Sequence, residues 1–489
     1  MSRFIPVQLK NWTNGQLFQT GVNASDVERH YVGVSKDTRT IKPNEVYVAL
    51  IGPNFDGHDF VDAALSSGAT MLVLKADHKM AKKMIKRLEK EPVNFDLLLV
   101  DDTLKAFQDI AHGYRQSLAA SVIGVTGSFG KTTTRRMIHS ILAPQMQAME
   151  TFANLNNEIG LSETLLNAQP EDQVLVTELA MDRRGEIQTL SAIAKPDVAI
   201  ITGIGHSHAQ FLGSLRAILE EKTSIIDSMK DNALCIVNGD NKMLEAWAIT
   251  KERDLSVWFV ASEQNTGRLE RDGFPVFWAE EIKLEKNGTH FVARSSFDSS
   301  HRWPMYIPEP GKHLISAALF GLATAYALGL NMECAAAAAA QFENTGDRQR
   351  IIERDGLTLI NDTYNASPES MYAAFDVLNL LSEGRRSLAV IGGMRELGKY
   401  SEAEHVELAK YILANPPEKV FVTGEEALPT YRYLSEHMAQ DQVVYENDLE
   451  RLISKVRSTV KRDDIVLFKA SRYHQVEKVA NALLESWPV

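Results

Sequence analysis

Apolar and polar positions alternate along the chain in a pattern that changes character twice. Up to about residue 117, short apolar runs are mixed with helical patterns. Runs at 46–52 and 70–76 predict strands, and the spacing at 62–67 and 80–90 predicts short helices. A helical connector at 108–117 leads into the next part. This first part therefore predicts a small α/β unit.

From residue 118 the chain alternates regularly between apolar strands and amphipathic helices. The predicted strands are SVIGV (121–125), QVLVTEL (173–179), DVAIITGI (197–204) and ALCIVNG (233–239). This order predicts a parallel sheet covered by helices on both faces. Shorter strand-like pieces between about 255 and 310, GRLERDGFPVFW among them, predict an antiparallel insertion. The Ala-rich stretch from His313 to Ala340 predicts a helix pair broken at Gly329.

A second alternating unit fills the last part of the chain. Its predicted strands are LTLINDT (357–363), SLAVIGG (387–393), KVFVTGE (419–425), QVVYEN (442–447) and DIVLFKAS (464–471). We therefore predict an α/β protein of three α/β domains in series, with residues 1–117, 118–342 and 343–489.

Composition supports this division. A chain of 489 residues has room for about three domains at roughly 150 residues each. With 44% hydrophobic and 24% charged residues it has a globular composition, which excludes disordered, collagen-like and coiled-coil chains. No apolar run approaches the ~18 residues of a membrane span, and the start of the chain lacks the layout of a secretory signal. Two cysteines, Cys235 and Cys334, are too few for a disulfide framework.

The charge balance narrows the class of partner. Lys and Arg number 52 against 64 for Asp and Glu, so the net charge is −12. This acidic balance argues against nucleic-acid binding, although a local basic pocket could still hold a small polyanion. We expect a cytoplasmic monomer with small-molecule partners and neither nucleic acid nor membrane.

The most specific local feature is a glycine-rich loop between a predicted strand and a predicted helix. The sequence Gly124-Val-Thr-Gly-Ser-Phe-Gly-Lys-Thr-Thr133 is a variant of the phosphate-binding loop. Its backbone amides and the helix N-terminus point positive character at a polyphosphate. Lys131 can reach the outer phosphates, and the hydroxyl of Thr132 can ligate Mg²⁺. The alternative is a glycine-rich turn without a ligand. ATP is the predicted cofactor, but such a loop alone selects no reaction.

Motifs along nearly the whole chain resemble the Mur ligase family. After residues 34–65 and the loop TGSFGKTTT they appear in family order: NLNNEIGLSETLL (154–166), TELAMDRRGEI (177–187), HAQFLGSL (208–215), TGDRQRIIERDGLTLINDTYNASPESM (345–371), GGMRELGKYSEAEH (392–405) and KASRYHQVE (469–477). The pattern is most similar to that of members that add D-alanyl-D-alanine to a UDP-N-acetylmuramoyl tripeptide, a step of peptidoglycan precursor synthesis. No D-N-P-R motif of the diaminopimelate-adding members occurs.

The resemblance implies an ATP-dependent ligase that forms an amide bond through an acyl phosphate. It implies a first domain that binds the UDP-sugar, a central P-loop parallel-sheet ATPase domain and a C-terminal Rossmann-like domain that binds the incoming amine. The implied partners are a UDP-muramoyl peptide and D-alanyl-D-alanine or another amine.

The resemblance also implies two Mg²⁺ ions, held by Thr132, Glu178, His208 and a carbamylated Lys222. A carbamate would turn the repelling ammonium of Lys222 into an anionic oxygen ligand. Taken alone, Glu178 reads as a strand-end cap, and Lys222 as a surface lysine beside two glutamates. His206 and His208 do not predict zinc, because no third ligand stands at a suitable spacing.

The remaining candidate residues follow from the same motifs. The implied catalytic residues are Lys131, Lys222, His208 and Arg348. The implied nucleotide contacts are Gly127, Ser128, Gly130, Lys131, Thr132, Thr133, Asn157, Arg348 and Asp362. The implied substrate contacts are Ser35, Asp37, Thr38, Arg39, His58 and Asp59 for the UDP-sugar, and Tyr364, Asn365, Lys469, Ser471 and Arg472 for the amine side.

Blander interpretations of these residues stay open. Asn157 and Asp59 suit helix caps and Tyr364 suits packing, while Lys469, Ser471 and Arg472 read equally well as exposed loop residues.

Three positions depart from the family pattern. Gly393 stands where an aspartate is usual, Gln210 stands where a glutamate is common, and both asparagines of an H-N-x-x-N motif are missing from 313–317. These departures leave two alternatives: a paralogue that joins another carboxylate and amine, and a non-catalytic nucleotide-binding protein on the same fold. Retention of Lys131, Thr132, Glu178, His208 and Lys222 argues against the second.

Overall fold

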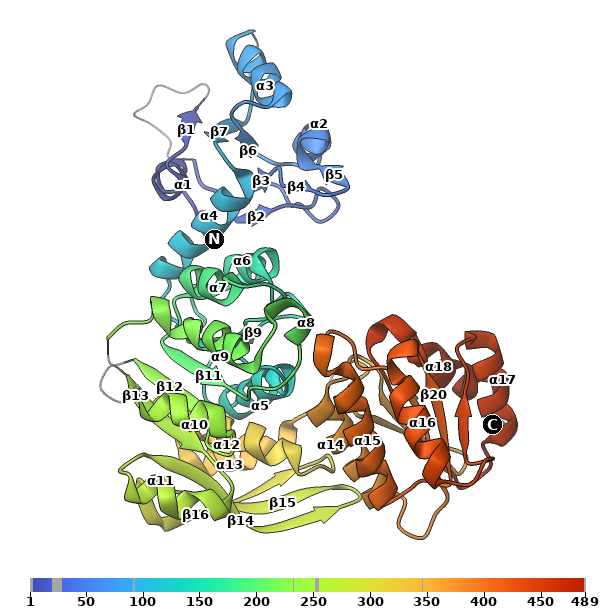
Figure 1. Ribbon diagram of the computed structural model, residues 1–489. Helices are drawn as coiled ribbons and strands as arrows, with labels where there is room; N and C mark the ends of the chain where they lie inside the picture. The colour runs from blue at the N-terminus through green and yellow to red at the C-terminus, as the bar shows by residue number, and fades with distance from the viewer. Residues whose placement is uncertain are drawn as a thin grey trace.

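The computed structural model describes residues 3–19, 29–90, 93–231, 233–250, 255–344 and 346–487. Three main sheets follow one another along the chain, and each carries helices on its faces (Figure 1). The predicted α/β class, with mainly parallel sheets, is confirmed. The proposed boundaries after residues 117 and 342 stay a prediction.

The first sheet has the strand order β1-β7-β6-β3-β2, and only β1 runs antiparallel to its neighbour. Its strands are β1 (Gln16–Phe18), β2 (Gly33–Ser35), β3 (Glu45–Val48), β6 (Met71–Lys75) and β7 (Asp96–Val100). The helices are α1 (Pro6–Thr13), η1 (Gly57–Phe60), α2 (Val61–Ser66), α3 (Lys79–Lys90) and α4 (Thr103–Ser117).

The strand predicted at 46–52 is interrupted. The backbone leaves the sheet after Val48, and β4 (Ile51–Gly52) pairs with β5 (Phe55–Asp56) in a separate hairpin. Leu50 accepts a hydrogen bond from the Gly57 amide, which closes this hairpin against the sheet. The apolar run therefore predicted the burial correctly but not the turn inside it.

The central sheet contains nine strands in the order β16-β15-β14-β13-β12-β11-β8-β10-β9. Its strands are β8 (Ser121–Thr126), β9 (Ala148–Glu150), β10 (Val174–Glu178), β11 (Val198–Ile201), β12 (Leu234–Asn238), β13 (Ser256–Val260), β14 (Val276–Glu285), β15 (Gly288–Ser295) and β16 (Asp298–Ile307). Its helices are α5 (Lys131–Leu142), α6 (Glu158–Asn167), α7 (Glu186–Ala194), α8 (Ala209–Leu212), α9 (Leu215–Thr223), η2 (Ser224–Ser228), α10 (Lys242–Ile249), α11 (Glu263–Arg271), α12 (His313–Ala327), α13 (Met332–Ala338) and η3 (Ala339–Gln341).

The antiparallel insertion predicted at 255–310 is wrong in its first half. Strand β13 pairs in parallel with both β12 and β14, and helix α11 connects β13 to β14. Two parallel neighbours need a crossover, which explains why the segment predicted as strand-like is partly helical. Only β14, β15 and β16 are antiparallel, and they extend the same sheet.

The third sheet has the order β17-β18-β22-β19-β20-β21, with β17 as its antiparallel edge. Its strands are β17 (Arg350–Arg354), β18 (Leu357–Asp362), β19 (Ser387–Gly392), β20 (Lys419–Thr423), β21 (Val443–Tyr445) and β22 (Ile465–Lys469). Its helices are α14 (Pro368–Leu381), η4 (Gly398–Tyr400), α15 (Ser401–Ala414), η5 (Glu425–Ala427), α16 (Leu428–His437), α17 (Leu449–Thr459), η6 (Arg472–His474) and α18 (Val476–Ser486).

Successive residues of the inner strands enter different cores. On β8, Ile123 packs into the core beneath α5 and α12, whereas Val122 packs on the opposite face. On β19, Val390 and Ile391 divide in the same way between two cores. This period of two on a sheet covered on both faces explains the near-continuous apolar strands of the sequence. Within the described ranges, no helix is long and apolar enough to cross a membrane.

Candidate active site

The glycine-rich loop joins β8 to α5 at the carboxyl edge of the central sheet. Gly127 and Gly130 adopt φ values of +149° and +74°, which favour glycine. A Cβ at Gly127 would lie 2.1 Å from the Thr202 hydroxyl, so a side chain does not fit there. Lys131 donates from Nζ to the Gly127 carbonyl at 2.7 Å. Burial lowers the pKa of Lys131, and the nearby cation Arg348 lowers it further.

Glu178 ends β10, the strand next to β8, and lies beside this loop. Its two carboxylate oxygens accept hydrogen bonds of 2.9 Å from the Thr132 hydroxyl and the Asn156 amide. The buried guanidinium of Arg135 approaches the same carboxylate to 3.6 Å. Asn156 and Arg135 were not predicted as site residues, although Asn156 stands in the motif at 154–166.

Lys222 is buried rather than on the surface. Its side chain is 0% exposed and, in the described part of the chain, its Nζ forms no hydrogen bond. Burial lowers its pKa well below the usual range of an amine, and the charge of Lys131 adds to that effect. Glu221 does not pair with it through a hydrogen bond, because its carboxylate accepts from the Gly185 and Ile187 amides at the start of α7.

His208 precedes α8 and meets a residue of the third sheet. Its Nδ1 lies 2.7 Å from Glu396 Oε2 and 3.5 Å from Asp182 Oδ1. These three side chains form one of the two clusters of potential metal ligands found among the described residues. Glu396 was not predicted, although it belongs to the motif at 392–405.

Helix α8 also carries the contact with the last third of the chain (Figure 1). The Gln210 amide donates to the Glu396 carbonyl at 2.9 Å. His206 Nδ1 lies 2.6 Å from Glu404 Oε1, and the His206 ring stacks on Tyr400 at 4.2 Å between centroids. The segment between β19 and α15 therefore forms one wall of the site.

The other residues from the third sheet lie at its carboxyl edge. Arg348 places its guanidinium 3.9 Å from the centre of the Tyr364 ring. Asp362, at the end of β18, accepts from Lys469 Nζ at 2.5 Å and from the Gln349 amide at 3.2 Å. Lys469 is 1% exposed and also donates to the Asn365 carbonyl, so both of these contacts are internal.

A cavity of about 1280 Å³ brings the two edges together. The candidate residues that line it are Ser128, Gly130, Lys131, Thr132, Thr133, Asn157, Glu178, His208, Arg348, Asp362, Tyr364, Asn365, Lys469, Ser471 and Arg472. Asn157 also caps α6 through the Gly160 amide. Gly127 and Lys222 are outside the lining, Lys222 being fully buried.

The six candidates of the first sheet are elsewhere. Ser35 ends β2, and Asp37, Thr38 and Arg39 follow it; there the Asp37 carboxylate accepts hydrogen bonds from the Arg39 backbone amide and guanidinium. His58 and Asp59 belong to η1, and Asp59 is exposed. These residues do not line the large cavity.

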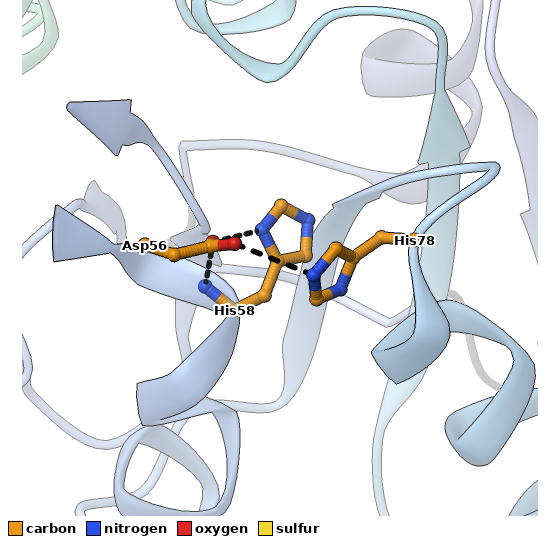
Figure 2. Close-up of side chains that lie close together, drawn as sticks. All are labelled: Asp56, His58 and His78. Atoms are coloured by element: carbon orange, nitrogen blue, oxygen red, sulfur yellow. Dashed lines mark hydrogen bonds and ion pairs between the residues drawn. The ribbon is translucent and has the colours of Figure 1, made fainter. Parts of the chain in front are cut away.

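Asp56, His58 and His78 form the second cluster of potential metal ligands (Figure 2). His58 Nδ1 lies 2.7 Å from one Asp56 oxygen, and His78 Nε2 lies 3.3 Å from the other. The remaining ring nitrogens accept backbone hydrogen bonds from Lys75 and Met80 at 3.0 and 3.1 Å. Each ring nitrogen already has a partner, so the geometry describes a hydrogen-bond network that ties η1 to the start of α3.

Comparison with known families gives three consecutive matches. Residues 30–115 match the Mur ligase family catalytic domain, 125–325 the Mur ligase middle domain, and 347–472 the Mur ligase glutamate ligase domain.

Two curated relatives cover nearly the whole chain. The UDP-N-acetylmuramoyl-tripeptide–D-alanyl-D-alanine ligase of Bacillus subtilis is 34% identical and covers 93% of each chain. Its counterpart from Escherichia coli is 30% identical and covers 98% of each.

Solved structures agree with these relatives. MurF from Acinetobacter baumannii superposes with a TM-score of 0.82 at 26% identity, over 99% of each chain. MurF from Thermotoga maritima, solved in complex with ADP, superposes with a TM-score of 0.76 at 26% identity, over 93% of this chain and 97% of that one.

Proposed function

The chain belongs to the Mur ligase family, and from this premise we propose that it joins D-alanyl-D-alanine to a UDP-N-acetylmuramoyl tripeptide at the expense of ATP. The product is a precursor of peptidoglycan. The observation that carries the proposal is the cavity in which the phosphate loop faces candidate residues of the third sheet. An ATP-driven condensation needs both the phosphate loop and the residues of the third sheet, because the nucleotide and the amine must reach the same carboxylate.

The proposed reaction has two steps. A carboxylate oxygen of the tripeptide attacks the γ-phosphorus of ATP, the bond to ADP breaks, and an acyl phosphate forms. The amine then attacks the acyl carbon, loses a proton and expels phosphate, which leaves an amide. Lys131 and Arg348, whose charges already influence each other, face the transferring phosphoryl group and stabilise its developing charge.

The residues around Glu178 fit a magnesium site. The hydroxyl of Thr132 and the carboxylate of Glu178 are oxygen donors in contact with each other, and the imidazole of His208 is a nitrogen donor that lines the same cavity. Bound Mg²⁺ would supply positive charge to the phosphate oxygens. Thr132 and Glu178 are 2.9 Å apart, which is a hydrogen bond that a metal ion would replace.

Lys222 fits the fourth ligand only in modified form. Burial without a hydrogen-bond partner among the described residues lowers the pKa of this amine, which favours the neutral form that reacts with carbon dioxide. A carbamate there would carry negative oxygen atoms, and we propose that it would help to hold the two Mg²⁺ ions. The modification accounts for a buried polar group that folding alone leaves unsatisfied.

The remaining roles divide along the chain. We assign the UDP-sugar to residues 1–117, with Ser35, Asp37, Thr38, Arg39, His58 and Asp59 as its contacts; ATP to 118–342, with Gly127, Ser128, Gly130, Thr133 and Asn157; and the amine to 343–489, with Tyr364, Asn365, Lys469, Ser471 and Arg472. Asp362 orients Lys469. We also propose a monomer that works in the cytoplasm, where ATP drives the reaction.

The test is a phosphate-release assay combined with mass spectrometry of the product. ATP, Mg²⁺, UDP-N-acetylmuramoyl tripeptide and D-alanyl-D-alanine should together yield ADP, phosphate and the UDP-muramoyl pentapeptide. Omission of either the UDP-muramoyl tripeptide or D-alanyl-D-alanine should abolish turnover, and Lys131→Ala should do the same. Turnover only with another amine would favour the paralogue, and ATP binding without turnover on any pair would favour the non-catalytic alternative.

A further inference from the structure

Arg395 is a cavity-lining cation that the motifs did not single out. It lies between β19 and η4, and its guanidinium stands 3.9 Å from the centre of the Tyr473 ring. Its Nε lies 3.4 Å from Glu426 Oε1, and its backbone amide donates to the Ser471 hydroxyl at 3.1 Å. An aromatic face, a carboxylate and a backbone hydrogen bond therefore hold the residue in one orientation.

The Glu426 carboxylate that contacts Arg395 occupies space left by a glycine. Gly393 carries no side chain, and a Cβ there would lie 2.9 Å from Glu426 Cβ and 3.1 Å from His474 Nε2. The His474 ring in turn fills the space beside Gly424, where a Cβ would lie 2.4 Å from it. Gly393 and Gly424 thus make room for Glu426 and His474, which support Arg395 from behind.

The front of the guanidinium faces the cavity. Among the described residues, its two Nη atoms form no hydrogen bond, and the contact with Glu426 is made through Nε. Two parallel N–H donors on a planar fork match the two oxygens of a carboxylate. Tyr473, which is 69% exposed, extends beside this fork and offers an apolar surface to a small side chain.

The other cations of the cavity have different surroundings. Arg348 acts electrostatically on Lys131 and so belongs to the phosphate end. Lys469 is held by Asp362 and is almost fully buried. Arg472 lies 5.8 Å from the Tyr364 ring, on the ring that Arg348 already covers. Among these four, Arg395 is the one whose guanidinium contacts both an aromatic ring and a carboxylate, Tyr473 and Glu426.

We infer that Arg395 binds the terminal carboxylate of the incoming amine and so selects a dipeptide with a free acid end. The inference rests on the proposed function, because only an amine that is also a carboxylic acid needs such a contact. The neighbouring Glu396 lies against His208, so this arrangement places the carboxylate beside the reacting end of the cavity.

The experiment compares two amines that differ only in this group: D-alanyl-D-alanine and D-alanyl-D-alaninamide. In the unaltered protein the amide should have a KM about 10- to 100-fold higher, because it loses a charge-assisted pair. In Arg395→Gln the KM for the acid should rise to nearly that of the amide, with kcat changed less than about threefold. Arg395→Lys should fall between them, since it keeps the charge and loses the fork.

Two further variants make the result specific. Arg432→Gln removes an exposed arginine on α16 and should leave both KM values unchanged. Arg472→Gln tests the rival cation. The inference is overturned if Arg395→Gln keeps the discrimination between acid and amide, or if only Arg472→Gln removes it. Absence of turnover by the unaltered protein with either amine would instead refute the proposed function, so the two failures are distinct.

Discussion

Lys222 on α9 and Lys469 at the end of β22 are both buried lysines, but their surroundings differ. Lys469 has an Asp362 carboxylate at 2.5 Å and a backbone carbonyl at 3.1 Å. Lys222 is as deeply buried and has no hydrogen-bond partner among the described residues. Folding accounts for the first lysine. Burial of the second costs free energy that no hydrogen bond from a described residue offsets.

The difference separates two kinds of buried charge. A paired charge stabilises the fold and says little about chemistry. An unpaired one next to the phosphate loop indicates a site, because perturbed groups gather where reactions occur. Opposite effects on stability and activity should follow when the two lysines are replaced.

The largest effect is expected for Lys222→Met. The substitution keeps the volume and removes the amine, so turnover should fall by about 10²–10³-fold. The free energy of unfolding should stay constant or rise by about 1 kcal/mol, since a buried unpaired polar group disappears. Steady-state phosphate release and denaturant unfolding measure the two quantities. A clear loss of stability would show that Lys222 has a structural partner after all.

The corresponding change at Lys469 should mainly lower the free energy of unfolding. Lys469→Met leaves the Asp362 carboxylate without its cation, so the free energy of unfolding should fall by about 3 kcal/mol. Urea denaturation followed by tryptophan fluorescence measures it. A variant as stable as the unaltered protein would mean that the pair contributes nothing to folding.

A double variant sharpens this result. Asp362→Asn combined with Lys469→Met removes both charges, so about 1–2 kcal/mol of the lost stability should return. The control is Asp362→Asn alone, which leaves the ammonium unpaired. If the double variant is no more stable than Lys469→Met, the loss comes from packing and not from the unpaired carboxylate.

The smallest effect is expected at His58, a third buried group. Burial lowers its pKa below the ordinary 6.5, although the bond to Asp56 offsets part of that shift. At a pH between the two pKa values, His58 is therefore protonated in the unfolded chain and neutral in the folded one. Its stabilising contribution is complete above about pH 6.5 and is lost as the pH falls towards the folded pKa, at most about 1.4 kcal/mol per pH unit.

His58→Gln tests this sign. An amide can replace both ring contacts without titrating, so the melting temperature should fall less between pH 7 and pH 5 than in the unaltered protein. His437→Gln, on the exposed end of α16, is the control and should keep the original pH profile. Parallel profiles for all three proteins would contradict the assignment.

Sequence reasoning succeeded where local patterns decide the structure. Most apolar strands and the glycine-rich loop were predictable because a covered parallel sheet needs continuous apolar runs, although the buried strand β7 was not predicted. The short edge strands β9 and β17 escaped prediction, since their residues are mostly half-buried and show no such run. Helix α11 was misread because its strong polarity resembles a loop between strands.

The site was harder to predict for a different reason. The sequence Glu-Glu-Lys around Lys222 looks like an exposed helix face, and only tertiary packing buries it. The sequence left Lys469 open between an amine contact and an exposed loop residue, and its pairing with Asp362 was not predictable because Asp362 stands 107 positions away in the chain. Asn156 and Glu396 stood inside recognised motifs, but their partners are distant in sequence: Asn156 contacts Glu178 within the central part, and Glu396 contacts His208 only where the last part meets the central one.

The contact between His206 and Glu404 joins side chains that are 198 positions apart in the chain. Since the His206 ring also stacks on Tyr400, three side chains from the central and last parts of the chain meet at His206. The last third of this chain is therefore not an interchangeable module. A chimera that grafts a relative's C-terminal part onto this central sheet must transfer residues 400 and 404 as a set that matches position 206, or it will assemble with a mismatched joint.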